Sequence, residues 1–70
     1  MPIAIASINT SLKIIKILVD EKTKRHLENL GILVNANILV LAKNDGNVII
    51  KVKDGRLAIN KETALKIFVG

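Results

Sequence analysis

This chain of 70 residues carries a formal net charge of +5 and contains no cysteine. Its length predicts one domain, spanning residues 1–70. The lack of thiols excludes disulfides and thiolate metal clusters, and the longest aliphatic run is far shorter than the ~20 apolar residues that cross a bilayer. We therefore expect a cytoplasmic protein.

Half of the residues are apolar, but Phe68 is the only aromatic one. The apolar residues are mainly Ile, Val and Leu, which favour strands over helices. The positive charge favours an anionic partner, such as nucleic acid, an acidic protein face or a lipid surface. Charge alone does not choose among these partners, and the lysines could equally be solvated side chains.

The first residues are apolar at mixed spacings. Ile3 and Ile5 alternate as in a short edge strand, whereas the spacing from Ile5 to Ile8 suits a helical turn, so we expect an extended lead-in with a turn near Ile8. Residues 12–19 read LKIIKILV. This pattern predicts a strand with room for one bulge.

A helix is predicted over residues 21–30. Asp20 can cap its N-terminus, and Gly31 supplies the left-handed residue that commonly ends helices. An apolar stripe should face the core, with the charged side chains in water. The stripe consists of Thr23, Leu27 and Leu30, and the solvated residues are Lys22, Lys24, Arg25 and Glu28.

The next segment is a turn followed by a strongly aliphatic strand. Residues 32–37 carry the chain around, and Asn35 is best able to take a positive φ angle there. The strand at 38–43 is apolar on both faces. Leu39 and Leu41 should therefore meet the helix, the opposite side of the sheet or another molecule.

The C-terminal part alternates strands with tight turns. Turns are predicted at 44–47 and 54–55, strands at 48–53, 56–59 and 67–69, and a helical turn capped by Asn60 at 61–65. Val48, Ile50 and Val52 should point inward, and Lys51 and Lys53 outward. Together these elements predict a mainly β fold, an SH3-like small barrel of about five strands with one inserted short helix and a terminal helical turn.

The residues that usually carry chemistry are scarce. The four glycines are too scattered to form a phosphate-binding loop, and His26 is the only imidazole. A transition-metal site needs three or four ligands, and a catalytic triad needs a histidine beside a nucleophile, so His26 is best interpreted as a surface residue. We expect no enzyme activity, no cofactor and no metal site.

Two stretches carry a family resemblance. RHLENLGI followed by ILVL, and the C-terminal GRLAINKETALKIFV, resemble the ferrous iron transport protein A (FeoA) family. Two departures replace glycine with asparagine, at Asn9 and in Val34-Asn35, where the family has Pro-Gly; a third is Ile59 for a usual leucine. Asparagine tolerates positive φ, so the turns can survive. The matching residues are Arg25, Leu27, Leu30, Gly31, Ile32, Leu57, Ala58, Ile59, Ala64, Ile67 and Val69.

The resemblance implies an SH3-like cytoplasmic accessory protein of bacterial ferrous iron uptake. Its expected partner is the membrane transporter FeoB, whose cytoplasmic part holds a G-protein-like domain, so the chain would be peripheral to the membrane through that partner. The family also has a general association with transition metal ions. We expect contacts through exposed aliphatic and basic side chains, namely Lys24, Arg25, Leu39 and Leu41.

The sequence leaves two alternatives open. The chain could be a small basic nucleic-acid-binding barrel, although such barrels usually stack bases on aromatic side chains and this chain has only Phe68. Self-association is also open, because a domain this short has a thin core.

Overall fold

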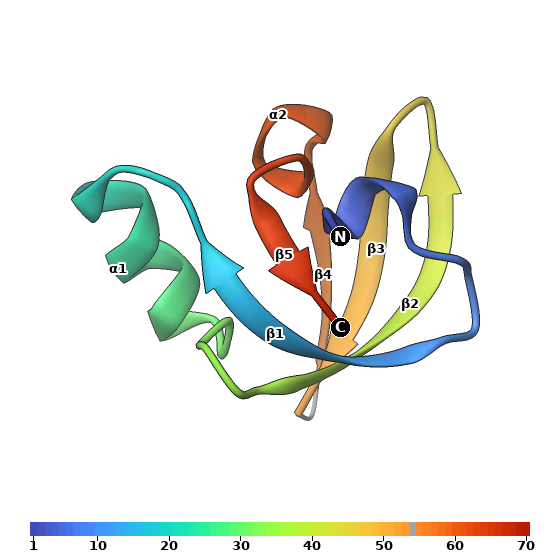
Figure 1. Ribbon diagram of the computed structural model, residues 1–70, viewed down its shortest axis with the longest axis horizontal. Helices are drawn as coiled ribbons and strands as arrows, with labels where there is room; N and C mark the ends of the chain where they lie inside the picture. Colours follow the sequence, from blue (N-terminus) through green and yellow to red (C-terminus); the bar gives the residue numbers. More distant parts are fainter. Residues whose placement is uncertain (54) are drawn as a thin grey trace.

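The computed structural model describes residues 1–53 and 55–70 (Figure 1). These described residues form five strands, two α-helices and an N-terminal 3₁₀ helix. In chain order these are η1 (Ile3–Ile5), β1 (Ser11–Ile17), α1 (Glu21–Asn29), β2 (Asn37–Asn44), β3 (Asn47–Val52), β4 (Gly55–Ile59), α2 (Lys61–Ala64) and β5 (Ile67–Val69). The turn expected at 54–55 includes Asp54, which lies outside the described residues.

The strands form one antiparallel sheet in the order β4-β3-β2-β1-β5. Figure 1 shows this sheet curling into an open barrel, with α1 on one side beyond β1. The mainly β, SH3-like fold expected from the sequence is therefore confirmed.

The two edges of the sheet differ. The N-terminus covers β5, because Val69 N–H donates to Met1 O at 2.7 Å and Pro2 bridges to Phe68. At the other edge, β4 has no strand on its outer side among the described residues. An exposed edge of this kind presents backbone donors and acceptors to a partner.

The N-terminal lead-in is not extended as expected. Residues Ile3–Ile5 form a 3₁₀ helix, in which Ile5 N–H donates to Pro2 O at 3.2 Å and Ala6 N–H to Ile3 O at 3.1 Å. The helix lets Ile3 and Ala6 enter the core while Ile5 faces solvent. Burial of Ile3 thus explains why the segment is helical despite its strand-like alternation. The expected turn at Ile8 is present.

In β1, the expected bulge is confirmed. Its register with β5 shifts between Ile14 and Lys16. Ile14 is fully buried, whereas Ile15 is 55% exposed, so the two adjacent isoleucines have opposite environments. The strand ends at Ile17, earlier than predicted.

Helix α1 begins after Asp20 and ends near Gly31, as predicted. Gly31 has φ 96°, and its N–H donates to Glu28 O at 3.0 Å, while Ile32 N–H donates to Leu27 O at 2.9 Å. At the N-terminus, a hydrogen bond from the Thr23 side chain lowers the pKa of the Asp20 carboxyl, although the geometry falls short of a capping bond to the backbone.

The core is aliphatic. Along β3, Val48, Ile50 and Val52 are buried and the alternate residues exposed, as the sequence predicts. In the part of the chain that the structure describes, the buried hydrophobic residues are Ile3, Ala6, Ile14, Leu27, Ile32, Ile38, Val40, Val48, Ile50, Val52, Ile59, Ala64, Ile67 and Val69. No helix in the described part of the chain is long and apolar enough to cross a bilayer.

Asparagine takes positive φ at the two turns where the family resemblance implied it. Asn9 has φ 61° and Asn35 has φ 75°. The hairpin between β2 and β3 uses Asp45 and Gly46, at φ 53° and 87°. Two successive residues at positive φ are typical of the tight turn that suits twisted antiparallel strands.

Candidate functional site

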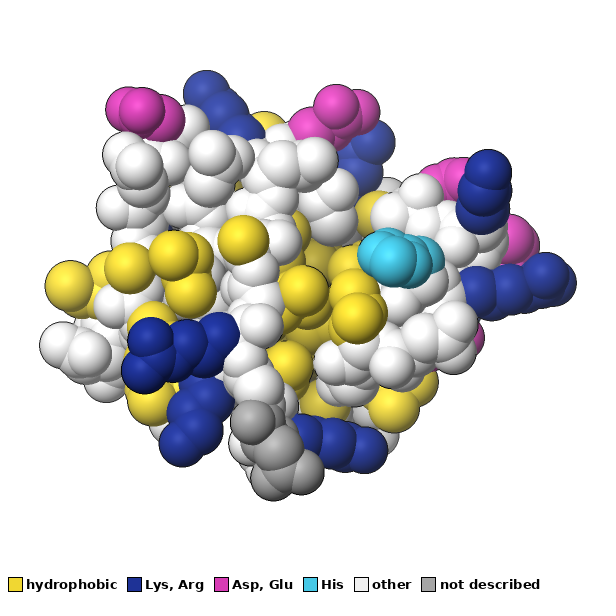
Figure 2. All heavy atoms as spheres, turned by 180° about the vertical axis from the view of Figure 1, so that it is seen from behind, with side chains coloured by type: hydrophobic (Ala, Val, Ile, Leu, Met, Phe, Trp, Pro, Cys, Tyr) yellow, Lys and Arg dark blue, Asp and Glu magenta, His cyan; other side chains and the backbone are white. Residues whose placement is uncertain are grey.

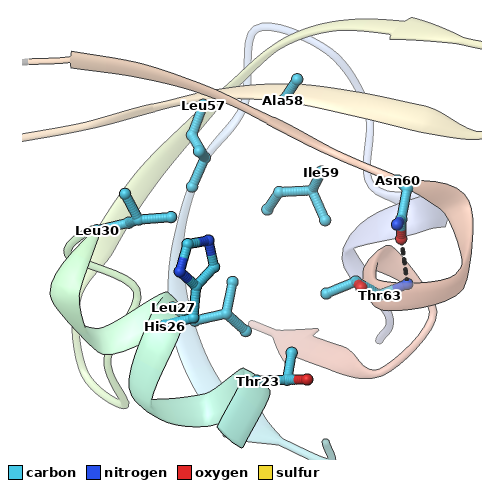
Figure 3. A pocket seen from close by; sticks show the side chains of 9 residues that line it. All are labelled: Thr23, His26, Leu27, Leu30, Leu57, Ala58, Ile59, Asn60 and Thr63. Carbon is cyan, nitrogen blue, oxygen red and sulfur yellow. Dashed lines mark hydrogen bonds between the residues drawn. The ribbon is translucent and has the colours of Figure 1, made fainter.

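A cleft of about 200 Å³ separates α1 from β4 and the start of α2. Figure 2 shows it as a hollow floored by apolar side chains, and Figure 3 shows the side chains that line it. These are Thr23, His26, Leu27, Leu30, Leu57, Ala58, Ile59, Asn60 and Thr63.

One wall of the cleft is a single face of α1. Its four residues, at 23, 26, 27 and 30, follow the spacing that places side chains on one side of a helix. Leu27 is buried and anchors the helix to the core, whereas Leu30 is 39% exposed. The predicted apolar stripe is therefore present, but only part of it is used for packing.

The opposite wall is the edge strand β4. Leu57 and Ile59 turn toward the interior, and Ala58 lies between them on the outer face of the sheet. An apolar cleft beside an unpaired strand edge is the geometry in which an extended segment adds a strand and inserts side chains. The arrangement is suited to binding a polypeptide.

His26 lies in this cleft. Its ring points between α1 and β4, toward Leu57 (Figure 3). No group of three or more His, Cys, Asp or Glu side chains in residues 1–53 and 55–70 is close enough together to hold a metal ion. The imidazole is therefore a polar group in an apolar wall, where it can contact a bound segment.

The four partner-binding residues expected from the sequence lie in two separate places. Arg25 is exposed and Lys24 half-buried on α1, while Leu39 and Leu41 are half-buried on β2. Figure 1 shows β2 running away from α1 toward the opposite side of the molecule, and none of these four residues lines the cleft. The structure does not bring the two pairs together.

Sequence reasoning missed the cleft. The helical stripe was a usable signal, because Leu30 lies at its end and had no predicted partner. Leu57 and Ala58 gave no such signal, since neither the position of β4 at the edge nor its proximity to α1 follows from local patterns.

A family model and a solved structure point to the same family. A family model described as FeoA domain matches residues 1–70. No curated protein shows significant similarity to the chain. A crystal structure of an iron uptake regulatory protein (FeoA) is 27% identical, with a TM-score of 0.86, and the match covers 100% of this chain and 93% of that one.

Two further structures show the same fold. A FeoA-like protein from Clostridium acetobutylicum is 22% identical, with a TM-score of 0.83, covering 100% of this chain and 84% of that one. The FeoA protein from Chlorobium tepidum is 17% identical, with a TM-score of 0.89, covering 99% of this chain and 68% of that one.

The family model matches every residue of the chain, and the family is one of accessory iron-transport proteins that is not a known family of enzymes. The chain therefore belongs to the FeoA family, and this membership indicates a role in ferrous iron uptake.

Proposed function

We propose that this chain is a cytoplasmic accessory protein that binds the G-protein-like cytoplasmic part of the membrane transporter FeoB. The observation that supports this most directly is the apolar cleft between α1 and β4, which adjoins the open edge of the sheet. The chain would then be membrane-peripheral through its partner, and its effect would be regulatory rather than catalytic.

The cleft favours an extended segment of the partner. Such a segment would pair with the outer edge of β4 and place an apolar side chain against Leu30 and Leu57. Main-chain hydrogen bonds would supply affinity, and the cleft would select the side chain. Lys24 and Arg25 lie on the same helix but do not line the cleft, so they would meet acidic groups of the partner outside it.

Leu39 and Leu41 remain a second candidate docking surface. They lie on β2, away from the cleft, and each is half-buried. A partner that used them would have to contact the outer face of the sheet. The two surfaces are far enough apart for substitutions to separate them.

The experiment is a titration of the isotope-labelled chain with the cytoplasmic part of FeoB, followed by amide chemical shifts. Binding in the cleft should perturb α1 and β4 most strongly. Leu30→Asp adds a charge to the cleft and should weaken binding at least tenfold, because a carboxylate there would lose its hydration. Leu65→Asp, at an exposed leucine outside the cleft, is the matched control.

The outcomes distinguish the surfaces. If Leu39→Asp and Leu41→Asp weaken binding while Leu30→Asp does not, the partner docks on β2 and the cleft assignment is wrong. If the cytoplasmic part of FeoB gives no shifts at all, the proposed partnership with this part of the transporter fails. Each variant is first checked for a native thermal transition.

A further inference from the structure

The outer face of the sheet carries a second feature, at the end opposite the β2–β3 hairpin. Ser11, Leu39, Lys51 and Arg56 are directly opposite one another in register across β1, β2, β3 and β4. Residues opposite one another in antiparallel strands share a face. The buried neighbours Ile38 and Ile50 show that this face is the outer one.

Lys53, the residue that follows β3, adds another basic side chain beside this row. It lines a shallow depression on the same face together with Leu39, Lys51, Ser11, Ile38 and Asn37. We call the surface formed by Leu39, Ile49, Lys51, Lys53 and Arg56 the basic face. Figure 2 shows Lys and Arg side chains gathered at the lower edge of the molecule, beside aliphatic ones.

Among the described residues, no carboxylate side chain belongs to the basic face. The carboxylate side chains that the structure describes lie elsewhere, in or next to α1, in the β2–β3 hairpin and in α2. They are Asp20, Glu21, Glu28, Asp45 and Glu62. Asp54, the remaining one, is outside the described residues.

Aliphatic side chains lie among the basic ones. Leu39 is in register with Lys51, and Ile49, two residues earlier in β3, is 39% exposed. Long basic side chains can lay their methylene groups along apolar surface and hold their charge beyond it. Aliphatic residues surrounded by Lys and Arg are the composition that suits the boundary between headgroups and acyl chains.

We propose that the basic face binds directly to the surface of a bilayer that contains anionic lipids. Lys51, Lys53 and Arg56 meet the phosphates of the headgroups, while Leu39 and Ile49 reach the acyl boundary. This contact is separate from the cleft and does not depend on FeoB. None of the basic-face residues lines the cleft.

A lipid surface fits this face better than nucleic acid does. Proteins that bind single strands combine positive charge with aromatic platforms for stacking, and Phe68, the only aromatic residue, lies on β5 at the other edge of the sheet. An aliphatic side chain gains little from contact with a phosphate backbone. It does gain from entering the apolar boundary of a bilayer.

The test is vesicle co-sedimentation of the purified chain. Phosphatidylcholine vesicles with and without phosphatidylglycerol serve as anionic and neutral surfaces, at low and at near-physiological salt. The wild-type chain should bind only the anionic vesicles, and less at higher salt. The triple variant Lys51→Gln, Lys53→Gln, Arg56→Gln should bind about a hundredfold more weakly, at about fivefold per charge.

A charge-matched control variant distinguishes the contribution of the basic face to vesicle binding from that of the net charge. Lys16→Gln, Lys22→Gln, Lys61→Gln removes the same number of charges at exposed positions away from the basic face. It should retain most of the binding. If the first triple variant has no native thermal transition, the single variants Lys51→Gln, Lys53→Gln and Arg56→Gln replace it, each with an expected loss of about fivefold.

Three results would overturn the proposal. One is no sedimentation with anionic vesicles at low salt. Another is an equal loss in both triple variants, which would mean that only net charge matters. The last is tighter binding to a single-stranded oligonucleotide, or to polyglutamate, than to vesicles at the same concentration of negative charge, which would assign the face to nucleic acid or to an acidic protein.

Discussion

Asn47 connects the β2–β3 hairpin to helix α2. Its side-chain oxygen accepts a hydrogen bond from the backbone N–H of Lys61 at 3.0 Å. A second asparagine, Asn60, accepts one from Thr63 N–H at 2.9 Å within the helix itself. Two side chains thus satisfy N–H groups in the first turn of α2, which a helix this short cannot pair internally.

Both asparagines should therefore stabilise the protein. Asn60→Ala is expected to lower the free energy of unfolding by about 1 kcal/mol, the usual cost of losing a helix cap. Asn47→Ala should cost a similar amount, about 0.5–1.5 kcal/mol, because it removes one hydrogen bond. Urea unfolding measures both. Asn29→Ala, at an exposed position outside both contacts, is the control and should change little.

Substitution of Gly46 should destabilise the protein more than substitution of Gly55. At Gly46, φ is 87° and an added Cβ would lie 2.6 Å from Lys61 Cδ and 2.8 Å from its Cγ, whereas nothing lies within 4 Å of one at Gly55. Gly46→Ala should lower the free energy of unfolding by about 1–2 kcal/mol from the left-handed backbone alone. Equal losses for Gly46→Ala and Gly55→Ala would contradict this account.

Two adjacent isoleucines in β3 allow a direct test of the core. Ile50 is fully buried and Ile49 is 39% exposed. Ile50→Ala should lower the free energy of unfolding by about 2–5 kcal/mol through lost burial and a cavity. In so small a domain that can remove most of the stability. Ile49→Ala should cost clearly less, and similar unfolding midpoints would show that the two environments are wrongly assigned.

Asn35 should accept glycine but not valine. Its φ is 75°, and its N–H donates to Ile14 O at 2.7 Å, so this turn positions the chain against β1. Glycine adopts positive φ without steric cost, whereas a β-branched residue does not. The urea midpoint of unfolding should be close to that of the wild-type protein for Asn35→Gly and distinctly lower for Asn35→Val.

Ionisation of the Asp20 carboxyl should make the stability of the protein depend on pH in the acid range. The Thr23 side chain lowers its pKa from 3.8 in the folded protein. A carboxyl with a depressed folded pKa contributes stability that is present above its unfolded pKa and is lost as pH falls through the folded value. The wild-type protein should exceed Asp20→Asn in stability near neutral pH, and the difference should shrink below pH 3.8. If the stability difference between the wild-type protein and Asp20→Asn persisted at low pH, the charge of Asp20 would not be its cause.

Local sequence patterns predict the structure correctly where only a few residue types tolerate the backbone conformation. Gly31 ends α1, and Asn9 and Asn35 take positive φ, because few residues tolerate that conformation. They failed at Ile3 and Ile5, whose spacing is compatible with a strand. Contacts with α2, β3 and β5, all distant in sequence, make this segment a 3₁₀ helix.

At the candidate site, too, local patterns predict one part of the structure and contacts between distant segments decide the rest. The spacing of Leu27 and Leu30 predicts one apolar stripe, but it does not indicate that Leu27 packs against the core and Leu30 faces a cleft. That difference depends on how far α1 lies from β4, and no pattern within either element encodes this distance. Sequence patterns likewise do not indicate that Lys24 and Arg25 lie apart from Leu39 and Leu41.

The five strands, the turns, the absence of cysteine chemistry and the family follow from the amino-acid sequence, because periodicity, turn residues and motif spacing are properties of short stretches. Which strand is left at the edge, which part of the helical stripe stays open, and which cations share a face are settled only in the folded chain. These depend on how segments far apart in the chain are brought together when the sheet curls into a barrel.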